Sequence, residues 1–146
     1  MVVFPREWAL GAYMNTEDMG KLVLRLTLGV LLLFHGTHKI LTGIGPIRDM
    51  IVAHHLPDFL AYFVYLGEVA APVLIIIGLL TRLGGVLVVI NMIVALLLAH
   101  TTMLMGTNEM GGYLLETQAF YLFTGLAVAL LGAGRFSIGG ADGTLN

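Results

Sequence analysis

The chain has 146 residues, of which 58% are hydrophobic and only 11% are charged. Soluble domains are typically about 45–50% apolar and about 25% charged, and one this small could not bury so much apolar surface. The composition therefore predicts an integral membrane protein with room for a single bundle. The net charge of −2 and the lack of a basic stripe argue against nucleic acid as a partner. The lack of cysteine excludes disulfide exchange, Fe–S clusters and thiolate metal sites within this chain.

Residues 1–20 are mixed in character and precede the first apolar run. We predict an interfacial or disordered segment there, with Trp8 and Tyr13 at the membrane surface, and Met14 is an alternative start. The apolar run that follows is too long for a signal-peptide core and has no small-residue cleavage pattern behind it, so no cleavable signal is predicted.

Four apolar runs then follow, each about long enough to cross a bilayer, which takes about 20 residues. They lie at about 22–44, 59–80, 83–105 and 113–131. The predicted fold is an all-α, integral membrane four-helix bundle spanning residues 21–138, followed by a tail at 139–146. A tight turn is predicted at Thr81–Gly85, between the second and third spans.

The loop after the first span is predicted to carry a short helix in the membrane interface. Ile47, Met50, Ile51 and His54 recur at i, i+3, i+4 and i+7, which places them on one helical face. Pro57 can then begin the second span at its first helical position.

The balance of basic residues predicts the orientation. Four spans place both termini on one side, which holds five basic residues against two on the other: Arg6, Lys21, Arg25, Arg82 and Arg135 against Lys39 and Arg48. The positive-inside rule then puts the termini in the cytoplasm. Arg25 lies one turn inside the first span, where its side chain can reach back to the headgroups.

Ionisable side chains occur within or at the ends of all four spans, and such groups are expensive in a membrane and often functional. At 1.5 Å per residue they all fall in the outer half of the bilayer, with no counterpart in the inner half. They are His35, His38, Glu68, His100 and Glu116. One outward-opening pocket that gathers them is the simplest prediction.

Glu68 has the most informative context. Pro72 lacks the N–H that would bond the carbonyl of residue 68, so the helix should bend there and leave a free carbonyl beside the carboxyl group. Tyr65, one turn earlier, could donate to the carboxylate. A carboxyl at this depth could exchange protons, whereas the structural alternative is an ion pair with Lys39, His35 or Arg25.

The histidines allow a weaker hypothesis. The pair His35 and His38 shares a helix face and could, with Glu68 and His100, form a nitrogen and oxygen metal site. Histidines in membrane helices are more often hydrogen-bonding partners, so no metal is predicted. Asn91 lies mid-span, and we expect it to form an interhelical hydrogen bond rather than line the pocket.

Several motifs together resemble the DoxX family of small bacterial four-helix membrane proteins. The resemblance covers about residues 20–138, and its departures are Ala133, where the family often has proline, and the sequence after Ser137. The motifs are Arg25-Leu-Thr-Leu-Gly29, Leu31-Leu-Leu-Phe-His35-Gly36-Thr-His-Lys39-Ile, Gly67-Glu68, Gly78-Leu-Leu-Thr81-Arg82 and Gly132-Ala-Gly134-Arg135-Phe-Ser137-Ile.

The family takes its name from a subunit linked to an archaeal thiosulfate:quinone oxidoreductase, and other members are associated with membrane oxidoreductase complexes and oxidative-stress responses. The resemblance therefore implies a redox-associated subunit that interacts with quinone or with a membrane oxidoreductase. The alternatives are a non-enzymatic scaffold or anchor for a partner protein, and a small-solute or lipid carrier. A homo-oligomer would make the carrier more plausible, because four spans without an inverted repeat are unlike common transporters.

Overall fold

The computed structural model describes residues 16–140 and 143–146, so most of the predicted segment at residues 1–20 lies outside the described residues. The described elements are helical, apart from one isolated bridge between Thr107 and Tyr113, which confirms the all-α fold class. In chain order they are α2 (Thr16–Thr42), α3 (Gly45–Ala53), η1 (Asp58–Phe63), η2 (Leu66–Ala70), α4 (Ala71–Ile77), α5 (Thr81–Ala99), η3 (Thr101–Met103) and α6 (Glu116–Leu131).

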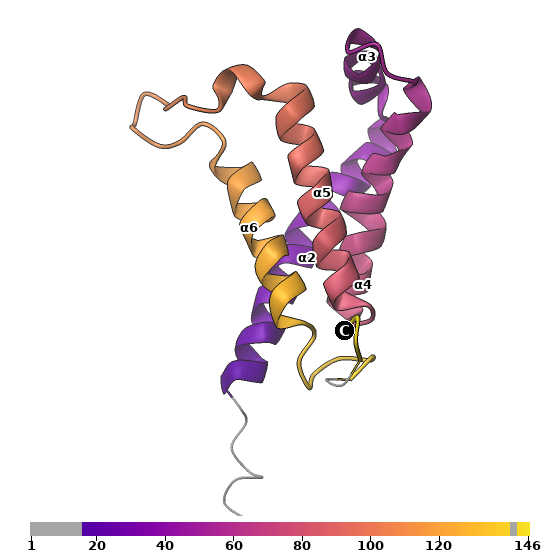
Figure 1. Ribbon diagram of the computed structural model, residues 1–146, viewed down its shortest axis with the longest axis vertical. Coiled ribbons are helices and arrows are strands. Elements are labelled where there is room, and N and C mark those ends of the chain that lie inside the picture. The colour runs from indigo at the N-terminus through magenta and orange to yellow at the C-terminus, as the bar shows by residue number, and fades with distance from the viewer. Residues whose placement is uncertain (1–15, 141–142) are drawn as a thin grey trace, which may run out of the picture.

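Three helices are long and apolar enough to cross a membrane: α2, the composite helix Asp58–Ile77, and α5. The fourth, α6, is apolar but has only 16 residues, or about 24 Å at 1.5 Å per residue. It is thus shorter than the run at 113–131 from which it was predicted. The chain is a multi-pass membrane protein, and its helices form one bundle (Figure 1).

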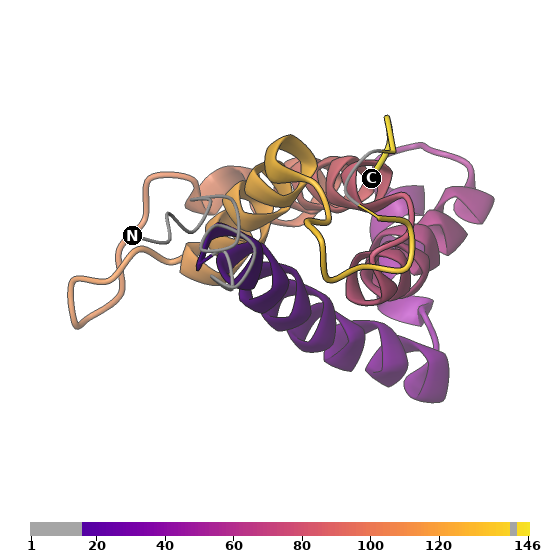
Figure 2. The ribbon, with the colours of Figure 1, turned by 90° about the horizontal axis from the view of Figure 1, so that it is seen from below.

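The helices are arranged so that α5 lies between α4 and α6, while α2 crosses the others diagonally along one side (Figures 1 and 2). We call the two ends of the bundle the α3 end, which carries α3 and the loop at 100–115, and the tail end, which carries residues 132–140 and 143–146. The core is a cluster contributed by α2, α4, α5 and α6, consisting of Leu28, Leu32, Ala71, Ile75, Val88, Met92 and Val128.

The second span is irregular just before Pro72, where the sequence predicted a bend. Residues Leu66–Ala70 form a π-helix, closed by a bond from the Ala71 N–H to the Leu66 carbonyl. Such π segments are often found at functional sites. The Glu68 carbonyl approaches Gly36 of α2 so closely that a Cβ there would overlap it. The π-helix and the glycine together let α2 and η2 meet backbone to backbone.

The turn between the second and third spans lies earlier than predicted. Gly78 and Leu80 both adopt left-handed backbone conformations, with φ of 70° and 51°, and α5 begins at Thr81. The prediction of a turn at Thr81–Gly85 was therefore wrong. The reason is that Gly84 and Gly85 serve helix packing instead: both are buried within α5, Gly84 against α4 and Gly85 against α6.

Two arginines hold the tail end together, and the first of them, Arg25, is buried. Because α4 ends at residue 77, its last carbonyls lack partners within the helix. Arg25 donates from Nη1 to the carbonyls of Ile75 (3.0 Å) and Ile76 (3.1 Å), and from Nη2 to the carbonyl of Phe136. Its side chain does not extend to the headgroups as predicted, because these carbonyls bind it inside the bundle, where it is 2% exposed.

Arg82 plays the same part for α6. Its Nη1 donates to the carbonyls of Ala129 (3.0 Å) and Leu130 (2.7 Å), and its Nε donates to Asn146 (3.0 Å). Asp18 is also buried at this end, where it accepts a hydrogen bond from the backbone N–H of Arg135. The expectation that this half of the bundle lacks a polar cluster was thus wrong, because helix ends in a membrane need such partners.

Close packing at Gly36 predicts a stability difference between two alanine substitutions in α2. Gly36→Ala places a methyl group against the rigid backbone of η2 and should lower the free energy of unfolding by about 3 kcal/mol. Gly20→Ala adds the same group where nothing lies within 4 Å and should be neutral or slightly stabilising. Thermal unfolding of both variants in one detergent tests this, and equal melting temperatures would contradict the packing.

Candidate functional site

The central polar contact is an ion pair between Lys39 of α2 and Glu68 of η2. The Glu68 side chain is 10% exposed and that of Lys39 is 24% exposed, so the pair lies mostly within the bundle. Tyr65 donates from its hydroxyl to the backbone carbonyl of Lys39 (3.2 Å) instead of to the carboxylate. Of the partners considered for Glu68, the structure selects Lys39, and Tyr65 fixes the backbone that carries it.

This ion pair lies in the wall of a cavity of about 630 Å³ bounded by α3, η1, η2 and α5. The other lining side chains are almost all apolar, among them Ile51, Phe63 and Val94. Ligand pockets in proteins commonly have about 300–1,000 Å³ and combine apolar walls with a few polar groups. The cavity therefore has the size and the polarity of a site for a small, largely apolar molecule.

Asn91 also lines this cavity, contrary to the sequence prediction. The cause is Gly67, where any Cβ would overlap the Asn91 side chain. Because Gly67 has no Cβ, α5 lies close to η2, and the Asn91 amide lies against Gly67, the residue before Glu68. The position of Asn91 within α5 does not reveal this contact, because the contact depends on Gly67 of another helix.

The three polar groups give the cavity a defined chemistry. A paired ammonium and carboxylate carry no net charge, which lowers the cost of their burial. The ammonium offers donors, the carboxylate offers acceptors, and the amide offers both. A ligand with carbonyl or hydroxyl groups could hydrogen-bond to all three, and the ion pair could give up or accept a proton.

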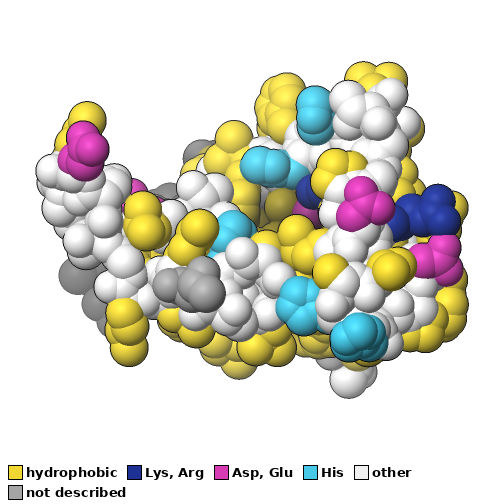
Figure 3. All heavy atoms as spheres, turned by 90° about the horizontal axis from the view of Figure 1, so that it is seen from above, with side chains coloured by type: hydrophobic (Ala, Val, Ile, Leu, Met, Phe, Trp, Pro, Cys, Tyr) yellow, Lys and Arg dark blue, Asp and Glu magenta, His cyan; other side chains and the backbone are white. Residues whose placement is uncertain are grey.

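The two histidines of α2 lie outside this cavity. His35 is exposed and packs edge-on against the ring of Tyr121 in α6, with ring centroids 5.7 Å apart. His38 is exposed one turn further on. Histidine side chains are scattered over the α3 end in Figure 3 rather than gathered in its hollow. Within residues 16–140 and 143–146, no three His, Asp or Glu side chains are grouped to hold a metal ion.

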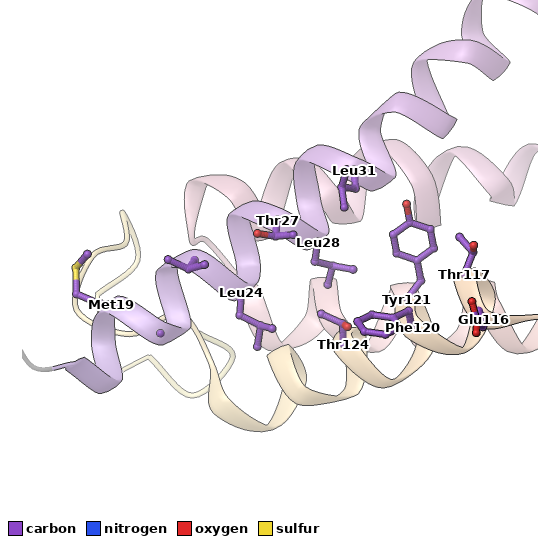
Figure 4. A pocket seen from close by; sticks show the side chains of 12 residues that line it. Met19, Leu24, Thr27, Leu28, Leu31, Glu116, Thr117, Phe120, Tyr121 and Thr124 are labelled. Carbon is purple, nitrogen blue, oxygen red and sulfur yellow. The ribbon is translucent and has the colours of Figure 1, made fainter. Parts of the chain in front are cut away.

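His100 and Glu116 belong to the α6 side of the bundle. The His100 ring lies 3.4 Å from the Gln118 amide through Nε2, and its Nδ1 is buried without a partner among the described residues. Glu116 lines a different cavity, between α2 and α6 (Figure 4). The predicted single pocket was therefore wrong: the diagonal crossing of α2 and the splay of α6 separate Glu116 from Glu68.

α3, the short helix predicted in this loop, covers the Glu68 cavity from the α3 end. Its Ile51 is buried and packs with Ile44 and Ala61. Arg48 on its other face pairs with Asp58 at 2.5 Å, and the hydrogen bond to that carboxylate raises the pKa of Arg48. α3 is thus held to the start of the second span by apolar packing on one side and by an exposed ion pair on the other.

The chain belongs to the DoxX family. The family model matches residues 20–101, which include α2, α3, the composite second span with Glu68, and α5. The match ends before α6, so the family relation is shown for the part of the chain that builds the Glu68 cavity.

A curated relative supports the same assignment. The Bacillus subtilis (strain 168) protein named "Putative oxidoreductase CatD" is 32% identical over 109 residues, covering 74% of this chain and 81% of the relative. No solved structure matches this chain.

Separate charge-removing substitutions should reveal the buried pair. Lys39→Met leaves the Glu68 carboxylate buried without its partner and should destabilise the fold by about 3 kcal/mol. The double variant Lys39→Met/Glu68→Gln should regain most of that loss. Arg48→Met removes one partner of the exposed pair with Asp58 and should change the stability little, because water solvates the charge that remains. Chemical unfolding measures all three, and a double variant no more stable than Lys39→Met alone would contradict the pairing.

Proposed function

We propose that this protein is a redox-associated membrane subunit that binds an isoprenoid quinone in the Glu68 cavity. The observation that supports it best is the position of the Lys39–Glu68 pair, in the wall of an otherwise apolar cavity. A quinone needs an apolar slot for its ring and hydrogen-bonding groups at its carbonyls. Membership of the DoxX family and the name of the Bacillus subtilis relative support the redox assignment.

The cavity residues take distinct parts in this proposal. Lys39 and Asn91 donate hydrogen bonds to the quinone carbonyl oxygens, and Glu68 exchanges protons with them. Reduction of a quinone to a quinol consumes two electrons and two protons. The chain has no cysteine to hold an Fe–S cluster. In this proposal a partner oxidoreductase supplies the electrons, and the ion pair supplies one route for the protons.

Quantifying co-purified quinone tests the proposal. Gently solubilised wild type should carry near-stoichiometric quinone by mass spectrometry. Glu68→Gln and Asn91→Leu should each retain about tenfold less, because each removes a hydrogen bond worth about 1.4 kcal/mol of affinity. Asn91→Leu leaves the ion pair intact, so its loss of quinone cannot be attributed to an unpaired lysine.

Glu109→Gln is the matched control, because Glu109 is exposed in the loop at the α3 end and lines neither cavity. It should retain quinone like the wild type. Background quinone in the wild type would contradict the proposal and favour the alternative of a scaffold that recruits an oxidoreductase without binding its substrate.

We also propose that the tail end faces the cytoplasm of a bacterial inner membrane. Lys21, Arg25, Arg82 and Arg135 lie at that end, against Lys39 and Arg48 towards the other, which is the asymmetry of the positive-inside rule. The proposal places the Glu68 cavity in the half of the membrane away from the cytoplasm.

Because the chain lacks cysteine, single cysteines can report this orientation. Met110→Cys at the α3 end and Thr144→Cys at the tail end both replace exposed residues. A membrane-impermeant maleimide added to spheroplasts should label the first, and the second only after lysis. The reverse pattern would place the tail end outside.

A further inference from the structure

The second cavity is a groove of about 700 Å³ between α2 and α6 (Figure 4). Its walls are apolar over most of their length, from Met19, Val23 and Leu31 on α2 to Phe120 on α6. Several of these side chains are open to the surroundings: Phe120 is 77% exposed and Val23 is 59% exposed. In a multi-pass membrane protein such a groove faces lipid, and the Glu68 site makes no use of it.

The polar groups of the groove lie mainly towards one end. Figure 4 shows Glu116 and Thr117 together at the start of α6, while Met19 and Leu24 line the opposite end. Glu116 is the only lining residue with a charged side chain. Within the described residues it forms no ion pair, whereas Lys21, Lys39 and Arg48 are each paired with another carboxylate. The groove is therefore apolar along most of its length and has the carboxylate of Glu116, without an ion-pair partner among the described residues, at one end.

Glu116 lies at the level where headgroups begin. Two residues further along α6, Gln118 is level with His100, the residue at which α5 ends. The α6 wall runs from Glu116 to Thr124 and the α2 wall from Met19 to Leu31, which is about 12 Å and about 18 Å at 1.5 Å per residue. Both lengths are close to the roughly 15 Å of one leaflet. A molecule with its polar head at Glu116 would thus lay its tail along the groove in one leaflet.

We propose that the α2–α6 groove binds one acyl chain of a phospholipid whose primary ammonium headgroup pairs with Glu116. Charge complementarity selects this occupant: a phosphatidylethanolamine ammonium can donate hydrogen bonds to the carboxylate, whereas an anionic headgroup is repelled. A second copy of the chain fits less well, because the groove walls contain no basic residue to meet the partner's Glu116.

Lipid binding to purified protein tests the proposal. Native mass spectrometry of the wild type, in detergent with equal concentrations of phosphatidylethanolamine and phosphatidylglycerol, should show about tenfold more ethanolamine adducts. Glu116→Gln should remove that preference. Glu109→Gln, which removes a carboxylate from the same end but outside the groove, should keep it.

Filling the groove separates it from the rest of the membrane surface. Thr124→Phe and Thr27→Phe enlarge side chains on opposite walls, and each should reduce adducts of both lipids, with circular dichroism confirming the fold. Equal adducts of the two lipids on the wild type, an undiminished preference in Glu116→Gln, or unchanged adducts in both filled variants would each overturn the proposal. So would a dimer that the filled variants abolish. None of these variants touches the Glu68 cavity, so the quinone proposal stands or falls separately.

Discussion

Hydrocarbon offers no water to a polar group, and this constraint accounts for most of the bundle's polar contacts. At the tail end, the backbone carbonyls at the ends of α4 and α6 need hydrogen-bond donors from the protein. Arg25 and Arg82 satisfy them from neighbouring helices, with residues 132–140 and 143–146 folded over the same end. Burial of the Arg25 guanidinium and partial burial of the Arg82 guanidinium are tolerable because each has several carbonyl acceptors.

Deeper in the bundle the same constraint falls on Glu68 and Lys39, which lie in different spans and neutralise each other. Pro72, the π-helix and Gly36 bring α2 and η2 together at this level. A purely structural ion pair needs no cavity beside it. Here the pair borders about 630 Å³ of mainly apolar space that also contains Asn91, which is why we assign it a ligand.

Local chain chemistry predicted much of the fold. Apolar runs predicted the helices, and the spacing of Ile47, Met50 and Ile51 predicted α3. Pro72 predicted a bend near Glu68, where the structure has a π-helix. Lys39 was one of the three partners considered for Glu68, with His35 and Arg25. These features depend on the backbone or on residues close in sequence. The spacing of apolar residues and the position of a residue along its span are enough to predict them.

The missed features all depend on how helices cross. A diagonal α2 and a short α6 separate Glu116 from Glu68, and depth along a span carries no information on the angle between spans. Gly67 brings Asn91 into the cavity from a different helix. Arg25 was assigned to the headgroups because a basic residue near a span end usually extends there. The carbonyls at the end of α4 that hold it instead belong to a segment 50 residues away in the chain.

Photoaffinity labelling with an azido-quinone, followed by peptide mapping, tests the central claim most directly. The account predicts that the label attaches to the walls of the Glu68 cavity, within residues 47–68 and 87–99, and that excess unlabelled quinone prevents it. Labelling confined to the α2–α6 groove, or labelling that unlabelled quinone does not reduce, would contradict a quinone site built on Glu68 and Lys39.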